Sequence, residues 1–233
     1  MAQEIRSIEF PMRLAGINMG TANCYLISNN TGYLLIDTGF PSIRAALEKE
    51  LESAGCHPGN LKLIVITHAD LDHIGNCAYL RQKYGTRIAM HPCEAGAAEH
   101  GDASLSRKRP PLFARLIGGV ILYAVAALSG FGRAEPFAPD FTVDGGFDLS
   151  GYGFDAKVIH LPGHSRGSIG IVTGAGDLFC GDLFWNMSKP GPHSIMDDRA
   201  AWQASVEKLK GMNIHTVYPG HGKPFPMDSL EAQ

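Results

Sequence analysis

The sequence lacks several features that would assign it to a common class of protein. It has no excess of basic residues: the formal net charge is −3, which gives no electrostatic case for binding nucleic acid. The five cysteines are scattered and form no CxxC pair, so reduced thiols in a cytoplasmic protein are the simplest expectation. The first residues carry an early acid and no apolar core, and they therefore predict no signal peptide.

A long hydrophobic run is also absent. Residues 116–132 contain no charged side chain, but they fall short of the roughly 18–20 residues of a membrane span and are rich in glycine and alanine. No transmembrane span is therefore expected. We interpret residues 97–140 as a helical insertion, either buried or forming a lid. The alternatives are a membrane-surface helix beside the basic residues 107–109 and a subunit interface in a homodimer.

The composition supports one globular domain over residues 1–233, of which 45% are hydrophobic. Apolar, β-branched runs predict strands, and apolar residues spaced three or four apart predict helices. The expected strands are 22–28, 33–36, 61–66, 87–90, 141–143, 154–161, 168–173, 178–180 and 214–218, and the expected helices are 41–54, 77–84 and 199–210. These elements form two successive halves, roughly 1–96 and 141–233, on either side of the insertion.

The densest group of polar residues lies in the stretch 67–76, Thr-His-Ala-Asp-Leu-Asp-His-Ile-Gly-Asn. His68, Asp70, Asp72 and His73 are all potential metal ligands. They occupy the loop between a predicted buried strand and a predicted helix, at the carboxyl end of the strand, where α/β folds place their chemistry. Imidazole and carboxylate groups suit divalent metals such as zinc, iron or manganese.

A simpler interpretation takes each of these residues separately. Asp72 could cap the following helix, because a carboxylate there accepts N–H groups that otherwise lack a partner. His68 and His73 could be ordinary hydrogen-bonded polar residues. Three later residues argue against this view: His164 in Pro-Gly-His-Ser, Asp182 in Cys-Gly-Asp-Leu and His221 in Pro-Gly-His-Gly. Each follows a predicted strand and a glycine, and together with the loop they supply enough ligands for two metals.

The combined pattern, with Asp37-Thr38-Gly39 at an earlier strand end, closely resembles the metallo-β-lactamase-fold superfamily of hydrolases. The resemblance covers nearly the whole chain except residues 97–140. It implies an α+β fold, a four-layer αβ/βα sandwich with the metals at one edge. It also implies a ligand set: His68, Asp70 and His164 on one metal, Asp72, His73 and His221 on the other, and Asp182 bridging both. Asp37 and His160 would support the ligands rather than bind metal.

The sequence departs from the commonest superfamily pattern, His-x-His-x-Asp-His, at one position, where Asp70 replaces the second histidine. A carboxylate occurs there in some branches, among them the flavodiiron branch. A third carboxylate makes the metal centre less positive. Such a centre lowers the pKa of bound water less, and it suits harder ions better. We expect two divalent metal ions, zinc in the first instance, with iron or manganese as alternatives.

These features predict a metal-dependent hydrolase in which a bridging water attacks the carbonyl of a lactone, ester, thioester or amide. Asp72 is the candidate for relaying the water proton. The partner would be a small-molecule substrate, with an apolar tail if residues 97–140 wall the pocket. Alternatives on the same fold are a diiron oxidoreductase, a phosphodiesterase and a ligand-binding sensor. Candidate substrate contacts are Tyr123, Arg166, His193 and Lys223.

Overall fold

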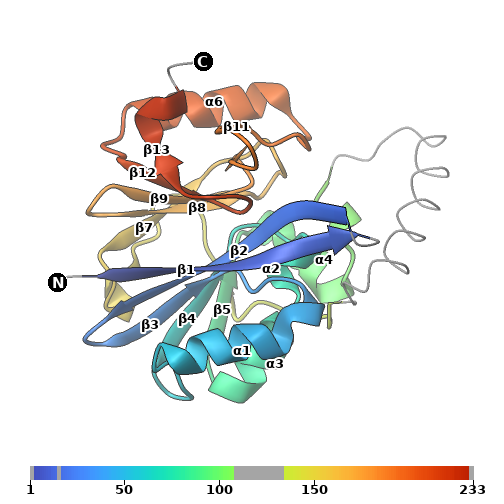
Figure 1. Cartoon of the computed structure of the whole chain (residues 1–233), viewed down its shortest axis with the longest axis vertical. Helices are drawn as coiled ribbons and strands as arrows, with labels where there is room; N and C mark the ends of the chain where they lie inside the picture. The colour runs from blue at the N-terminus through green and yellow to red at the C-terminus, as the bar shows by residue number, and fades with distance from the viewer. Residues whose placement is uncertain (1–2, 15–16, 108–133, 231–233) are drawn as a thin grey trace.

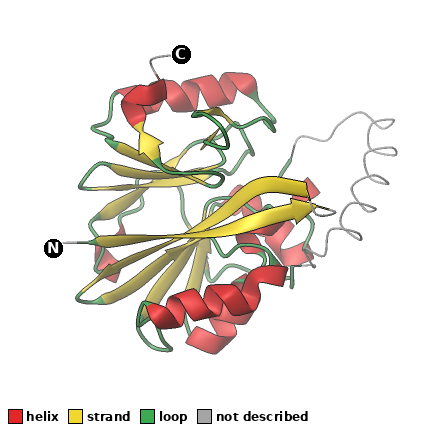
Figure 2. Cartoon of the chain, in the orientation of Figure 1, coloured by secondary structure: helices red, strands yellow, loops and turns green. Residues whose placement is uncertain are grey.

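Two β-sheets lie face to face, and helices cover their outer faces (Figures 1 and 2). The computed structural model describes residues 3–14, 17–107 and 134–230. The expected four-layer αβ/βα arrangement is confirmed: helices, sheet, sheet and helix follow one another from the bottom to the top of Figure 2. No helix in the described ranges is long and apolar enough to cross a membrane.

The first sheet contains six strands in the order β1-β2-β3-β4-β5-β6. Strands β1 to β3 pair antiparallel, and β3 to β6 pair parallel. The strands are β1 (Glu4–Leu14), β2 (Ile17–Asn29), β3 (Gly32–Ile36), β4 (Leu61–Ile66), β5 (Arg87–Met90) and β6 (Phe141–Thr142). Its outer face packs against α1 (Arg44–Ser53), α3 (Cys77–Tyr84) and α4 (Pro92–His100).

The second sheet contains five strands in the order β13-β12-β9-β8-β7 and carries one long helix on its outer face. The strands are β7 (Ala156–His160), β8 (Ile169–Thr173), β9 (Asp177–Gly181), β12 (Thr216–Pro219) and β13 (Phe225–Pro226), and the helix is α6 (Arg199–Lys210). A separate two-stranded ribbon joins β10 (Phe184–Trp185) and β11 (Gly191–Pro192). The short helices are η1 (Pro41–Ile43), α2 (Leu71–Ile74), η2 (Ala103–Leu105), η3 (Leu149–Tyr152) and η4 (Met227–Leu230).

Strand β4 shows why the chain forms four layers. Side chains alternate between the two faces of a strand, so a strand that is buried on both faces is apolar at successive positions. Leu63 and Val65 pack between the two sheets, whereas Ile64 and Ile66 pack against the helices, and all four are fully buried. The apolar run that predicted this strand therefore contributes to two of the three core layers.

Several boundaries differ from the sequence prediction. Strand β1 was not predicted, although its register with β2 is continuous apart from one irregularity. Helix α4 was also missed, because its sequence has no apolar face of helical period; Pro92 starts it and Gly101 ends it with a left-handed φ of 63°. Strand β6 pairs with β5 and so belongs to the first sheet, not to the second half.

The predicted insertion, 97–140, is only partly described. Its first residues complete α4, and Ala134 and Phe137 at its other end are buried against the first sheet and its helices. Residues 108–133, which include Tyr123 and the uncharged run 116–132, lie outside the described residues.

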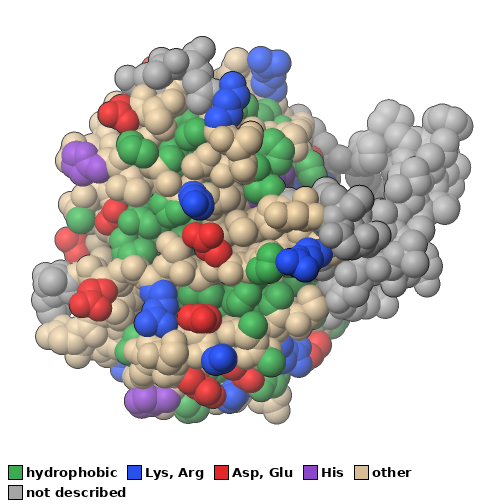
Figure 3. Space-filling view, viewed as in Figure 1, with side chains coloured by type: hydrophobic (Ala, Val, Ile, Leu, Met, Phe, Trp, Pro, Cys, Tyr) green, Lys and Arg blue, Asp and Glu red, His purple; other side chains and the backbone are tan. Residues whose placement is uncertain are grey.

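The face of the molecule in Figure 3 carries basic and acidic side chains interspersed with one another.

Candidate metal centre

The predicted ligands come from four loops that all begin at the carboxyl end of a strand. Residues 67–70 follow β4, and Asp72 and His73 lie on the short helix α2. His164 lies in the loop after β7, Asp182 follows β9, and His221 follows β12. Strands β9 and β12 pair parallel up to Gly181 and Pro219, which places Asp182 and His221 side by side.

Asp182 lies at the centre of the group. Its Oδ2 atom is 3.2 Å from His221 Nε2, 3.5 Å from His164 Nε2 and 3.8 Å from His68 Nε2. Its Oδ1 atom is 3.5 Å from His73 Nε2. One buried carboxylate therefore contacts all four predicted histidine ligands, which come from three different loops. This is the position that the resemblance gave to a bridging ligand.

The remaining carboxylates divide the histidines into two groups. Asp70 Oδ2 is 3.4 Å from His68 Nε2 and 3.2 Å from His164 Nε2, and these two nitrogens are 3.1 Å apart. On the other side, Asp72 Oδ2 is 3.3 Å from His221 Nε2 and 3.8 Å from His73 Nε2. The structure thus brings together all seven residues singled out in the sequence, in the two groups expected.

The capping interpretation of Asp72 is wrong. Asp72 lies within α2, and the N-cap position of that helix is held by Asp70, whose side chain makes no capping hydrogen bond. Asn76 is the N-cap of α3, again without a side-chain cap. Both aspartates instead direct their carboxylates at histidines.

Asp37 supports the centre without facing it. Its carboxylate accepts hydrogen bonds from Thr67 N, Thr67 Oγ1 and His73 Nδ1, each at 2.8 Å. Its φ of 60° is the left-handed conformation, which a residue other than glycine adopts at a cost. Because Nδ1 of His73 donates to Asp37, its Nε2 atom faces Asp72 and Asp182, as a metal ligand requires.

Backbone carbonyls orient two further histidines in the same way. His164 Nδ1 donates to the carbonyl of Ile195 at 2.7 Å, and His221 Nδ1 donates to that of Thr21 at 2.8 Å. Each ring therefore presents Nε2 to the centre. Histidine ligands characteristically have such a partner on the other nitrogen, which holds the tautomer and the ring orientation.

The charges within the cluster shift its pKa values in opposite directions. Burial lowers the pKa of His68 to about 3, so this ring is neutral. Burial also lowers the pKa of His221, but the Asp182 and Asp72 carboxylates outweigh it and raise the pKa to about 9. The same balance raises the pKa of His73, and although burial raises the pKa of Asp182, the surrounding histidines hold it well below its usual value. Asp182 is therefore ionised at the centre of the group, and its charge favours a cation there.

Two of the glycines beside the ligands are required by close packing. A Cβ atom on Gly220 would collide with the Asp182 carboxylate, and one on Gly181 would lie 2.8 Å from the Thr67 side chain. Gly181 also has a positive φ of 51°. Glycine therefore lets the Asp182 and His221 loops approach one another and the central loop.

Two charged residues at the centre were not predicted from the sequence. Glu94 on α4 is fully buried, and its carboxylate contacts the loops that carry His68 and His164. The Arg107 guanidinium contacts the Asp70 carboxylate and the carbonyl of His164, and its Nη2 is 2.6 Å from His164 Nε2. Each lies far from its partners in sequence, so no local pattern indicated either.

The candidate substrate contacts fall in different places. His193 joins the centre, with Nε2 at 3.4 Å from Asp182 Oδ2. Arg166 instead lines a pocket of about 230 Å³ with Cys93 and Asp198. Lys223 is exposed two residues beyond His221.

The donor set suits a metal. Within the described residues, Nε2 of His73 and Oδ1 of Asp182 are buried without a hydrogen-bond partner. They lie 3.5 Å apart, and both can offer a lone pair to a metal ion once the His73 ring has lost a proton. A cation between such atoms would satisfy both. The groups that meet metal-site geometry include His68, His164 and Asp182, and Asp72, His73 and His221.

Comparison with known protein families gives an assignment. The family model of the metallo-β-lactamase superfamily matches residues 17–221, which include every residue of the candidate centre. The chain belongs to the metallo-β-lactamase superfamily. Its fold and the order of its polar motifs along the chain agree with this assignment.

Three relatives show how the chain compares with individual members of the superfamily. A β-lactamase-like protein 2 homolog of Drosophila melanogaster is 24% identical over 90% of the chain, and the chain spans only 62% of its length. The hydroxyacylglutathione hydrolase GloC of Haemophilus influenzae is 28% identical over 70% of the chain and 66% of its own length. TTHA1623, whose structure was solved in a di-iron-bound form, is 27% identical in sequence. The match covers 96% of this chain and 97% of the TTHA1623 chain, with a TM-score of 0.66.

Proposed function

We propose that this superfamily member is a metal-dependent hydrolase that acts on an ester-like carbonyl: a lactone, an ester or a thioester. The observation that carries the proposal is the position of Asp182, whose two oxygens lie within 3.8 Å of His68, His73, His164 and His221. A single carboxylate shared by two histidine groups fits a dinuclear centre better than two separate mononuclear sites.

The seven clustered residues would hold two divalent metal ions: His68, Asp70 and His164 the first, Asp72, His73 and His221 the second, and Asp182 both. When bound, the metals would supply a water made acidic enough to act as a nucleophile and a Lewis acid for the carbonyl oxygen. Zinc is our first choice for an imidazole-rich set, with iron or manganese as alternatives because Asp70 adds a third carboxylate.

The protein's own side chains would position the substrate and transfer protons. The Asp72 side chain is 16% exposed, so its carboxylate can take a proton from the attacking water and pass it to solvent. The Arg107 guanidinium, 15% exposed beside Asp70, adds a positive charge that can attract an anionic substrate group. His193 lies close enough to Asp182 to contact a bound substrate.

The name of the relative GloC, which describes hydrolysis of an acyl derivative of glutathione, supports the carbonyl class. The test is a panel of ester, lactone, thioester and phosphodiester substrates, given to the protein before and after metal removal and reloading. We expect metal-dependent hydrolysis of at least one carbonyl substrate and none by Asp182→Asn. Full activity of metal-free protein would contradict the proposal, and hydrolysis of the phosphodiester alone would contradict the carbonyl class.

A second candidate is a diiron redox protein. Asp70 provides a hard oxygen donor beside His68 and His164, and the related TTHA1623 was solved in a di-iron-bound form. Visible iron absorption together with oxygen consumption would favour this candidate. A colourless, zinc-loaded protein that hydrolyses a carbonyl substrate would exclude it.

A further inference from the structure

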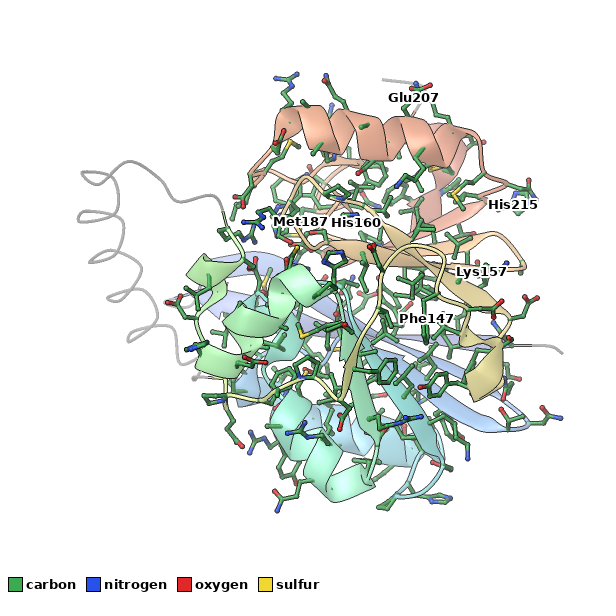
Figure 4. The ribbon with its side chains drawn as sticks, turned by 180° about the vertical axis from the view of Figure 1, so that it is seen from behind. Phe147, Lys157, His160, Met187, Glu207 and His215 are labelled. Carbon is green, nitrogen blue, oxygen red and sulfur yellow. The ribbon has the colours of Figure 1, made fainter. Side chains whose placement is uncertain are left out.

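A second group of metal-ligating side chains lies outside the candidate centre. His91 precedes α4 at the end of β5, Asp144 follows β6, and His160 is the last residue of β7. Figure 4 shows His160 at the back of the molecule, where the two halves of the sandwich meet. One ligand atom from each residue lies within 4.8 Å of the other two. None of the three belongs to the set proposed for hydrolysis.

Asp144 and His160 present two acceptors to one another. Nε2 of His160 donates to the carbonyl of Arg166 at 3.0 Å, so in the neutral ring the lone pair is on Nδ1. That Nδ1 atom faces Asp144 Oδ1 at a distance of 3.8 Å. Two lone-pair atoms in this arrangement repel unless a cation lies between them. The cation can be a proton on His160 or a metal ion.

His91 contributes a third ligand atom. Its side chain is only 5% exposed, and its Nε2 atom, 3.4 Å from Asp144 Oδ1, has no hydrogen-bond partner within the described residues. Burial and the neighbouring His160 lower the pKa of His91, so the ring is neutral near pH 7 and protons compete weakly for it. The His91 and His160 rings stack at a centroid distance of 4.4 Å, so one ring must turn before both nitrogens bind the same ion, because imidazole binds a metal in the plane of its ring.

We propose that His91, Asp144 and His160 form a separate zinc-binding site. Zinc bonds to nitrogen and carboxylate oxygen are about 2.0–2.2 Å long, so tetrahedral ligand atoms are about 3.4 Å apart. The His91–Asp144 separation of 3.4 Å matches this value, and the His160–Asp144 separation of 3.8 Å needs a small closure. Asp144 is 67% exposed, which leaves the fourth position open to water.

Zinc binding requires a proton shift within His91. Nδ1 of His91 accepts a hydrogen bond from Cys93 N at 3.1 Å, so the ring proton is on Nε2, which faces Asp144. A zinc ion takes the Nε2 lone pair, and the proton then resides on Nδ1, which gives up the bond to Cys93 N. Cys93 is at the surface, where water can replace this partner. The tautomer of His91 is therefore a direct report of metal at this site.

The site would join the two halves of the fold. His91 and Asp144 follow strands of the first sheet, whereas His160 belongs to the second. A bound ion would clamp the sheets together on the side where β7 leads into the His164 loop. Because a ligand that binds only the folded state stabilises it, zinc should raise the melting temperature through this site.

The test compares the wild type with Asp144→Asn and with the matched control Asp148→Asn, which removes an equal charge four residues away. The asparagine side chain can still accept the hydrogen bond from Gly145 N, but its amide is a poor zinc ligand. After equilibrium dialysis against buffered zinc, elemental analysis should find about one zinc fewer per chain in Asp144→Asn than in the other two proteins. Equal zinc content in all three would overturn the proposal.

Nitrogen NMR of the histidine rings supplies a second readout. On addition of zinc, the His91 proton should move from Nε2 to Nδ1 in the wild type and in Asp148→Asn, but not in Asp144→Asn. An unchanged tautomer in the wild type would overturn the site. Asp182→Asn tests the hydrolytic centre independently, because its loss of zinc does not depend on Asp144.

Discussion

The carboxylate of Glu94 accepts a hydrogen bond from the backbone N–H of Ala69 at 2.9 Å, directly beside His68. Its other oxygen accepts hydrogen bonds from Ser165 Oγ at 2.8 Å and Gly167 N at 3.0 Å. One buried side chain on α4 therefore holds the two loops that carry His68 and His164. It acts on the candidate centre by positioning both ligands.

Replacing Glu94 with glutamine should weaken the first metal site. The amide nitrogen of glutamine would face an N–H or O–H donor that now bonds to a carboxylate oxygen of Glu94. That buried donor would lose its acceptor, and the loop that carries it would move. We expect a loss of about 1–3 kcal/mol in the free energy of unfolding and a 10–100-fold lower metal affinity. Denaturant unfolding and metal titration measure these two effects. The control Glu99→Gln, on an exposed position of the same helix, should change neither.

Asp70 should control metal selectivity. Asp70→His replaces a hard anionic oxygen with an imidazole between His68 and His164, so the preference should shift toward zinc over manganese or iron. Asp70→Ala should mainly empty the first site. Competition between the metals, followed by elemental analysis, measures the shift. Unchanged selectivity in Asp70→His would mean that Asp70 serves Arg107 and not the metal.

Metal binding should release protons near pH 7. The pKa values of His73 and His221 are raised, the latter to about 9, so both rings are protonated in the metal-free protein. Ligation requires neutral imidazole, so each of these protons must leave when metal binds, and affinity should rise with pH up to about 9. His68, with a pKa of about 3, should release none.

Calorimetric zinc titration in buffers of different ionisation enthalpy counts these protons. We expect about two per chain at pH 7 in the wild type and about one fewer in His221→Ala. A binding enthalpy that is the same in every buffer would contradict the assignment of His73 and His221 as ligands.

The apolar sequence of residues 116–132 leads to a prediction about substrates. If this run contributes to the substrate pocket, each buried methylene should add roughly 0.8 kcal/mol, about fourfold in kcat/KM, until the pocket is full. A series of esters or lactones of increasing chain length tests this with the intact protein. Efficiency that does not change with chain length would remove the apolar tail from the proposed substrate.

The sequence by itself determined most of the core strands and the ligand loops that follow them. In β4, burial on both faces requires apolar residues at the successive positions 63–66, so this strand was recognisable without any neighbour. The central loop was equally clear, because His68, Asp70, Asp72 and His73 occur within six residues. His164, Asp182 and His221 could be added because each follows a strand of the same kind. Their role as metal ligands stays a prediction.

Only the tertiary structure decided which distant charges meet. Glu94 precedes its partner Ser165 by 71 residues, and Arg107 is 37 residues from Asp70. His91, Asp144 and His160 likewise approach one another only because β5, β6 and β7 end on the same side of the sandwich. Strand β1 and helix α4 also depend on their neighbours, β1 on pairing with β2 and α4 on its packing against the first sheet. Local sequence carries periodicity and ligand spacing, whereas a contact between residues far apart in the chain exists only after the two sheets have packed.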